Sequence, residues 1–170
     1  MTGARIEIML EDKGLRGRLG VLAQRLEDPA DLYDAIGAVL ASGVQRRFIA
    51  AKDPEGALWK QSGRARHGRR GGKTLTDTGR LQQSIAWSVQ ADGVLVGTNV
   101  KYAAIHQFGG EIVAKNASAL AFTLADGTTV VTKKVTMPAR PFLGVDAEDR
   151  AAAGAVMRDW LEAALPMTGP

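Results

Sequence analysis

Residues 28–51 read DPADLYDAIGAVLASGVQRRFIAA, and their apolar side chains recur every three or four positions. This spacing places them on one face of an α-helix. Asp28 is suited to cap such a helix, and Pro29 to occupy its first position, where a backbone N–H is not needed. The sequence therefore predicts a helix over about 29–51 as the main core element, with an apolar face of Leu32, Ile36, Val39, Leu40, Val44 and Phe48.

Further helices are predicted on both sides of this one. Upstream, four leucines at helical spacing predict a helix of about three turns that ends at Asp28, and before it residues 5–10 alternate like a half-buried strand. Downstream, Asp146 is suited to cap a last helix that Pro166 ends. The apolar residues of these two helices are Leu15, Leu19, Leu22, Leu26, Val156, Met157, Trp160, Leu161 and Leu165.

The middle of the chain has the period-two pattern and Asp-Gly turns of β-hairpins. One hairpin is predicted over about 85–98, and a second where LAFTL and TVVTKKV flank residues 125–128. A short helix over about 101–108 is predicted between them, with Gly109 available as a left-handed cap. Another short helix through Leu81 and Ile85 can be capped by Thr76, Asp77 or Thr78.

These elements predict an α+β fold in one domain that covers residues 1–170. We expect a mostly antiparallel sheet, built from the two β-hairpins plus the N-terminal strand and flanked by helices. A chain of this length can bury a core without crosslinks, and it contains no cysteine. No segment approaches the roughly 18 apolar residues that a membrane helix requires, so no membrane partner is expected.

A long basic loop interrupts this pattern between residues 52 and 75. Six of the 22 Lys and Arg residues lie in KQSGRARHGRRGGK, which has no acidic residue, so the rest of the chain has fewer basic than acidic residues. With little apolar surface to bury, the loop is expected to be flexible in the free protein. Its cations are Lys60, Arg64, Arg66, Arg69, Arg70 and Lys73.

Two partners suit such a loop. Clustered cations attract the phosphates of nucleic acid, but no interleaved aromatic residue stacks bases and no recognition helix follows, so contact with DNA would be nonspecific. Docking on an acidic protein partner is the other interpretation, and both stay open. Trp59, beside the loop, is a candidate interface residue, whereas Trp87 and Trp160 fit core positions.

His106, in the stretch YAAIHQFGG, is the residue most easily mistaken for a catalytic group. It has no local nucleophile or orienting acid, and G-x-S-x-G is missing. Two distant histidines do not form a zinc site, and no phosphate-binding glycine motif occurs, so no catalytic, metal or cofactor site is predicted. His106 is interpreted as a packed helix residue.

Three segments together resemble the bacteriophage virion morphogenesis family, the tail-completion proteins of Mu-like phages. They are LTDTGRLQQSI (75–85), VGTNVKYAAIHQFGG (96–110) and MPARPFLG (137–144), and their order and spacing also match. The resemblance implies fold-defining roles for these segments. Residues expected to shape turns, to fix the helix near 101–108, or to lock the extended segment are Asp77, Thr78, Gly79, Leu81, Tyr102, Ala103, Gln107, Phe108, Gly109, Gly110, Pro138, Arg140, Pro141 and Phe142.

What the resemblance implies about function is a non-enzymatic structural protein of the virion, assembled in the cytoplasm of the bacterial host. Such a protein acts in tail completion and head–tail joining at the neck, as a subunit of a homo-oligomeric ring around the DNA channel. Its partners would be other neck and tail proteins and head-connector proteins, with nonspecific contact with packaged DNA. Arg140, held between two prolines, is a second candidate interface residue. The alternative function is a sequence-nonspecific nucleic-acid-binding module that uses the loop at 60–73.

Overall fold

The computed structural model describes residues 14–67, 72–115, 117–124 and 126–165. Over these residues the chain forms six helices and six short strands, so the predicted α+β class is confirmed. The strand predicted at residues 5–10 lies outside the described residues. The helices are α1 (Leu15–Glu27), α2 (Ala30–Ala50), α3 (Gly63–His67), α4 (Arg80–Gln83), α5 (Ala103–Phe108) and α6 (Ala147–Ala164). The strands are β1 (Ala86–Gln90), β2 (Gly93–Gly97), β3 (Gly110–Val113), β4 (Leu120–Thr123), β5 (Thr129–Thr132) and β6 (Lys134–Met137).

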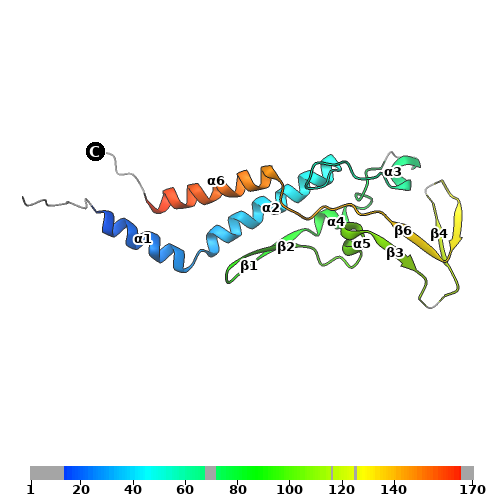
Figure 1. Ribbon diagram of the computed structural model, residues 1–170, viewed down its shortest axis with the longest axis horizontal. Helices are drawn as coiled ribbons and strands as arrows, with labels where there is room; N and C mark the ends of the chain where they lie inside the picture. Colours follow the sequence, from blue (N-terminus) through cyan, green and yellow to red (C-terminus); the bar gives the residue numbers. More distant parts are fainter. Residues whose placement is uncertain (1–13, 68–71, 116, 125, 166–170) are drawn as a thin grey trace, which may run out of the picture.

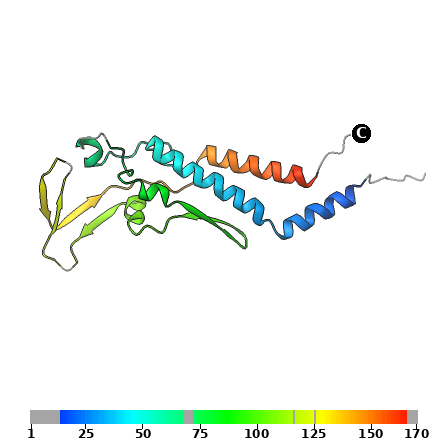
Figure 2. The same cartoon turned by 180° about the vertical axis from the view of Figure 1, so that it is seen from behind.

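The molecule is elongated, with the long helices toward one end and the ribbons β3–β6 and β4–β5 toward the other (Figure 1). Helix α6 packs along α2, and hairpin β1–β2 packs against another side of α2. Helix α1 continues beyond this pair after a bend between α1 and α2. The reverse view shows the same order, with β4–β5 at the end opposite α1 (Figure 2). The centre is therefore packed from several sides, while both ends extend away from it.

The strands do not form the single sheet that was expected. Within the described residues they make three separate two-stranded antiparallel ribbons: β1–β2, β3–β6 and β4–β5. Both predicted hairpins are present as β1–β2 and β4–β5. The stretch TVVTKKV is divided between β5 and β6, however, and β6 pairs with residues 110–113, which had not been predicted as a strand. The β4–β5 hairpin is thus carried at the end of the β3–β6 ribbon instead of joining the other strands.

The core lies where α2 meets the middle of the chain. Phe48 of α2 is fully buried and contacts Trp59 edge-to-face, with ring centroids 5.6 Å apart, and Phe142 at 5.3 Å. Aromatic pairs at such distances stabilise a core beyond the area that they bury. Leu81 and Ile85 close the same cluster. The predicted apolar face of α2 is confirmed as the main core element.

Trp87 and Trp160 differ in burial, although both were expected in the core. Trp160 is buried, and its indole N–H donates to Asp31 Oδ1 at 2.9 Å. Trp87 remains 40% exposed because it packs at the surface of α2, where its N–H donates to Asp34 Oδ1 at 2.9 Å. A side chain at Gly37 would collide with the Trp87 ring, so the glycine permits this packing.

The ends of the helices agree with the sequence at α6 and differ at α2 and α4. Asp146 caps α6 in a reciprocal capping box with Asp149, as expected for the residue that starts this helix. Asp28 is not the N-cap of α2: Pro29 takes that position without a side-chain cap. Helix α4 ends at residue 83, and Gly79 starts it with a φ of 74°, a conformation that favours glycine.

Candidate functional site

The extended segment 138–143 is the point where the three sequence motifs meet. Gln107 of α5 binds it through its whole side-chain amide. The amide oxygen accepts from the backbone N–H groups of Phe142 and Leu143 at 2.9 and 3.0 Å, and the amide nitrogen donates to the Leu143 carbonyl at 2.9 Å. Two prolines keep this segment out of helical pairing and leave its backbone groups available. The predicted fold-defining role of Gln107 is thereby confirmed.

Gly109 and a main-chain bond bring α5 still closer to this segment. Arg140 N–H donates to the His106 carbonyl at 2.7 Å. A Cβ atom at Gly109 would lie 2.7 Å from the backbone nitrogen of Ala139 and 2.9 Å from the Met137 carbonyl oxygen. Gly109 also has φ 69° and ψ −172°, a backbone conformation restricted to glycine in practice, rather than the left-handed cap that was expected. Close approach and conformation both require glycine here.

Trp59 and Arg140 attach the start of the basic loop to the same segment. Trp59 is only 6% exposed, and its indole N–H donates to the Pro141 carbonyl at 2.9 Å. Arg140 Nε donates to the Lys60 carbonyl at 2.7 Å. Trp59 therefore belongs to the core, which corrects its interpretation as an interface residue: a single tryptophan in a polar loop gave no periodicity from which its burial could be read.

Helices α2 and α6 are joined by a buried ion cluster that the sequence had not predicted. Arg47 and Asp149 are 3% and 0% exposed, and the guanidinium pairs with the Asp149 carboxylate and with Asp146 at 3.1 Å. Arg46 binds the other Asp149 oxygen at 3.0 Å. Burial lowers the pKa of Arg47, while the Asp146 charge opposes that shift. These partners are about a hundred positions apart in the sequence, so no local pattern could reveal them.

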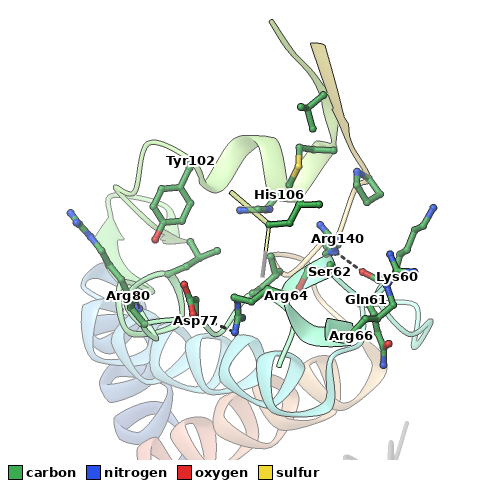
Figure 3. A pocket seen from close by; sticks show the side chains of 18 of the residues that line it. Lys60, Gln61, Ser62, Arg64, Arg66, Asp77, Arg80, Tyr102, His106 and Arg140 are labelled. Atoms are coloured by element: carbon green, nitrogen blue, oxygen red, sulfur yellow. Dashed lines mark hydrogen bonds and ion pairs between the residues drawn. The ribbon is translucent and has the colours of Figure 1, made fainter. Parts of the chain in front are cut away.

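A cavity of about 810 Å³ opens beside the hub formed by α5 and segment 138–143 (Figure 3). Residues 60–66, the turn before α4, helix α5 and strand β6 all contribute to its walls. Arg64 and Asp77 form an ion pair at 3.3 Å across one side. The cavity therefore lies between the basic loop and the family-like motifs. Its lining includes Lys60, Arg64, Arg66, Asp77, Arg80, Tyr102, His106 and Arg140.

His106 lies on the wall of this cavity but has no catalytic arrangement around it. Its ring contacts Tyr102 edge-to-face, with centroids 5.9 Å apart. Burial first, and then the nearby charge of Arg140, lowers the pKa of His106, which favours the neutral imidazole. Its Nδ1 atom is buried without a hydrogen-bond partner among the described residues. Asp77, the acid that lines the cavity there, pairs with Arg64 and so orients no base.

The four described cations of the basic loop differ in their surroundings. Lys60, Arg64 and Arg66 line the cavity, whereas Lys73 is exposed and its carbonyl accepts from Arg64 Nη2 at 2.6 Å. Arg69 and Arg70 lie outside the described residues. The described part of the loop contains α3 and the buried Trp59.

Within the described residues, neither a metal-ligand cluster nor a membrane-spanning helix is found. The described residues contain no group of three or more His, Cys, Asp or Glu side chains placed to hold a metal ion. Among the helices in the described ranges, none combines the length and the apolar character needed to span a bilayer.

Comparison with known proteins agrees with the motifs that build the hub. The model of the phage virion morphogenesis family matches residues 10–162. The Mu-like prophage FluMu G protein 2 of Haemophilus influenzae (strain ATCC 51907 / DSM 11121 / KW20 / Rd) is 34% identical over 130 residues, which are 76% of this chain and 76% of that protein. No solved structure gave a significant match.

The family match includes every residue of the hub, of the cavity wall and of the ion cluster between α2 and α6. The match therefore extends over nearly all of the described residues rather than over one isolated motif. The chain belongs to the phage virion morphogenesis family.

Proposed function

We propose that the protein completes the phage tail and joins tail to head at the neck, as a subunit of a ring around the DNA channel. Its family membership establishes the coarser role, a structural part of the phage virion. The finer role is tail completion and head–tail joining, and the observation that supports it most is the hub. The family-like segments pack on one another through Gln107 and Gly109 and thereby fix a shape, with no reacting group placed among them.

Exposed apolar side chains at both ends and beside the hub support self-association. On α1, Leu15, Leu19 and Leu26 are each more than half exposed, and the helix has no buried residue. Phe108, in the family motif, is 79% exposed, and Val131 of β5 is 68% exposed. Apolar patches of this kind mark protein contact sites, and neighbouring ring subunits are the partners that would cover them.

A non-enzymatic role is part of this proposal. Catalysis by His106 would need a nucleophile and an orienting acid within hydrogen-bond reach. Neither is present among the described residues around it, and its neutral imidazole is packed against Tyr102. Replacing His106 by Gln should leave particle infectivity unchanged.

The test is electron microscopy of particles produced by a phage or prophage that lacks this gene product. If the protein joins tails to heads, filled heads should accumulate beside unjoined tails, and supplying the protein should restore complete particles. Normal, infectious particles in its absence would contradict the proposal.

Nonspecific DNA binding is the second candidate, and the exposure of Lys60, Arg66 and Lys73 favours it. It requires appreciable affinity of the isolated protein for duplex DNA that falls steeply as salt rises, because each phosphate contact releases counterions. Neutralising Arg64, Arg66, Arg69 and Arg70 together should then abolish binding. Affinity that is weak and unaffected by these changes would remove this candidate.

A further inference from the structure

We propose that the cavity beside α5 is a docking site for an acidic peptide segment of a partner protein, with Arg140 pairing with a carboxylate of that segment. The inference rests on the proposed function for the nature of the partner, another virion component, and deepens it by naming the chemistry of the contact. It does not depend on the ring or on the position at the neck.

Two buried arginines of this chain have opposite surroundings. Arg47 and Arg140 are 3% and 4% exposed. Arg47 is paired with the carboxylates of Asp146 and Asp149, whereas Arg140 has no carboxylate within ion-pair distance among the described residues. Burial lowers the pKa of Arg140, and no neighbouring acid opposes that shift. A buried cation without a counter-charge is costly, so the site is incomplete as it stands.

The unused part of the Arg140 side chain is open to the cavity. Its Nε is bound to the Lys60 carbonyl, and its two terminal nitrogens have no acceptor among the described residues. Neither terminal nitrogen is fully buried. Arg140 lines the cavity, as Figure 3 shows. Because a guanidinium presents its N–H groups as a planar fork, it binds a carboxylate through two parallel bonds.

The rim of the cavity carries an excess of positive charge. Lys60, Arg66 and Arg80 line it, and the one lining acid among the described residues, Asp77, is paired with Arg64. The segment at 68–71, which follows α3, reads Gly-Arg-Arg-Gly and supplies no carboxylate. Neither the described residues nor residues 68–71 supply the counter-charge, and a field of one sign would steer an acidic partner into the opening.

The rest of the lining favours a peptide over nucleic acid. Leu75, Leu81, Tyr102, Val135 and Met137 give the cavity apolar walls between its cations. A volume of about 810 Å³ accommodates a few side chains, whereas a DNA duplex is too wide to enter. Acidic side chains next to apolar ones match both features of the lining.

The probe is a blocked tetrapeptide, acetyl-Leu-Glu-Glu-Leu-amide, titrated into the full chain by calorimetry, beside the same peptide with Gln in place of Glu. We expect the Glu peptide to bind with a Kd of about 0.01–1 mM and the Gln peptide to bind at least about tenfold more weakly. Absence of binding by the Glu peptide at about 1 mM, or equal binding of both peptides, would overturn the proposal.

Variants locate the binding. R140K keeps the charge but loses the fork and should weaken the Glu peptide about tenfold. The double variant K60Q/R66Q changes two exposed residues of the rim, so it should fold normally and weaken the peptide several-fold. R158Q, an exposed change of one charge on α6 away from the cavity, is the matched control and should stay within about twofold of the parent. Equal losses in R158Q would mean that only net charge matters and would overturn the proposal.

Two further experiments, competition by DNA and particle assembly, complete the test. A short duplex that displaced the peptide with the same dependence on Arg140 would assign the cavity to phosphate instead, against the proposal. Peptide binding in solution is measured without assembly, so it can fail while the phage still needs the protein for tail joining. Conversely, a dispensable protein with an Arg140-dependent peptide site would contradict the tail-joining role and leave this inference standing.

Discussion

The absence of a Cβ atom at Gly43 of α2 allows the ion cluster to join α2 and α6. A Cβ atom there would lie 2.7 Å from the carboxylate carbon of Asp149, the acid that pairs with Arg47. The Asp149 carboxylate cannot move away from this position without separating a buried ion pair. The ion cluster therefore depends on a glycine that looks, in the sequence, like an unfavourable residue in the middle of a helix.

Replacing Gly43 by Ala tests this dependence. We expect the free energy of unfolding to fall by about 2–4 kcal/mol, since the change separates a buried ion pair. Gly154→Ala on α6 is the matched control, because a Cβ atom there meets nothing within 4 Å. That variant should be neutral or more stable by up to about 1 kcal/mol. Urea denaturation measures both, and similar values for the two variants would contradict the role of the cluster.

The pKa of His106 gives a second prediction at the level of the residue. Folding lowers this pKa below the ordinary value of 6.5, so below that pH the unfolded state takes up a proton that the folded state resists. Stability should thus be constant from about pH 8 to 7 and fall as the pH is lowered through 6.5 toward the pKa of the folded protein. His106→Gln should flatten this decrease. Denaturant midpoints measured between pH 8 and 5 would contradict the sign if they rose on acidification.

At the scale of elements, the central feature is the attachment of α5 to the extended segment 138–143. Neither piece is long enough to be stable alone, because short isolated helices are marginal in water. Three hydrogen bonds from one Gln107 side chain hold them in register, and Gly109 allows their backbones to touch. The two motifs are therefore one structural unit formed from two distant parts of the sequence.

Gln107→Ala measures the strength of this unit. It removes three hydrogen bonds and leaves two backbone N–H groups without their acceptor, so we expect a loss of about 2–4 kcal/mol in the free energy of unfolding. Gln83→Ala, an exposed change at the end of α4, should cost less than about 0.5 kcal/mol. Thermal unfolding followed by circular dichroism would show the difference, and a Gln107→Ala variant as stable as the control would refute the attachment.

Elements with a strong local signal were predictable from the sequence, and those set by distant partners were not. The spacing of apolar residues predicted α1, α2 and α6, and the Asp-Gly turns predicted β1–β2 and β4–β5. Strand β3 was missed because it has only four residues and begins at the second of two glycines, and its partner β6 lies more than twenty positions away. The single sheet was wrong for the same reason: hairpin signals predict pairs of neighbouring strands but not how separate pairs associate.

The site was predictable only in part. The family-like motifs identified Gln107, Gly109 and Arg140 before the structure showed their contacts. The burial of Trp59 and the pairing of Arg47 with Asp149 needed the folded chain, since their partners lie far away in sequence. The basic loop was recognised from charge alone, but charge could not tell that three of its cations line a cavity while Lys73 is exposed.

The described part of the molecule is elongated, and both of its ends carry apolar side chains that the described residues leave exposed (Figures 1 and 2). A structural protein of the virion needs such surfaces for its neighbours, whereas its centre must keep a fixed shape. The buried ion cluster and the hub keep the centre in a fixed shape. We propose that Phe108 contacts a neighbour, because it follows directly after the hub residue Gln107 and is 79% exposed.

Phe108→Ser should separate assembly from stability. Because the ring is exposed in the isolated chain, we expect unfolding free energies within about 0.5 kcal/mol of the parent, together with a loss of infectious particles in a complementation assay. Leu58→Ser is the matched control, an exposed apolar residue outside the family-like motifs, 73% exposed. It should restore infectivity as the parent does. Full complementation by Phe108→Ser would show that this residue contacts no neighbour.

A cryo-electron microscopy map of the complete particle would show whether the protein is a building block of the neck. We expect the α2–α6 pair, with the β1–β2 hairpin against it, to fit repeated density that encircles the DNA channel where tail meets head. A map of that region with no density for this fold, or purified infectious particles that lack the chain, would contradict the account.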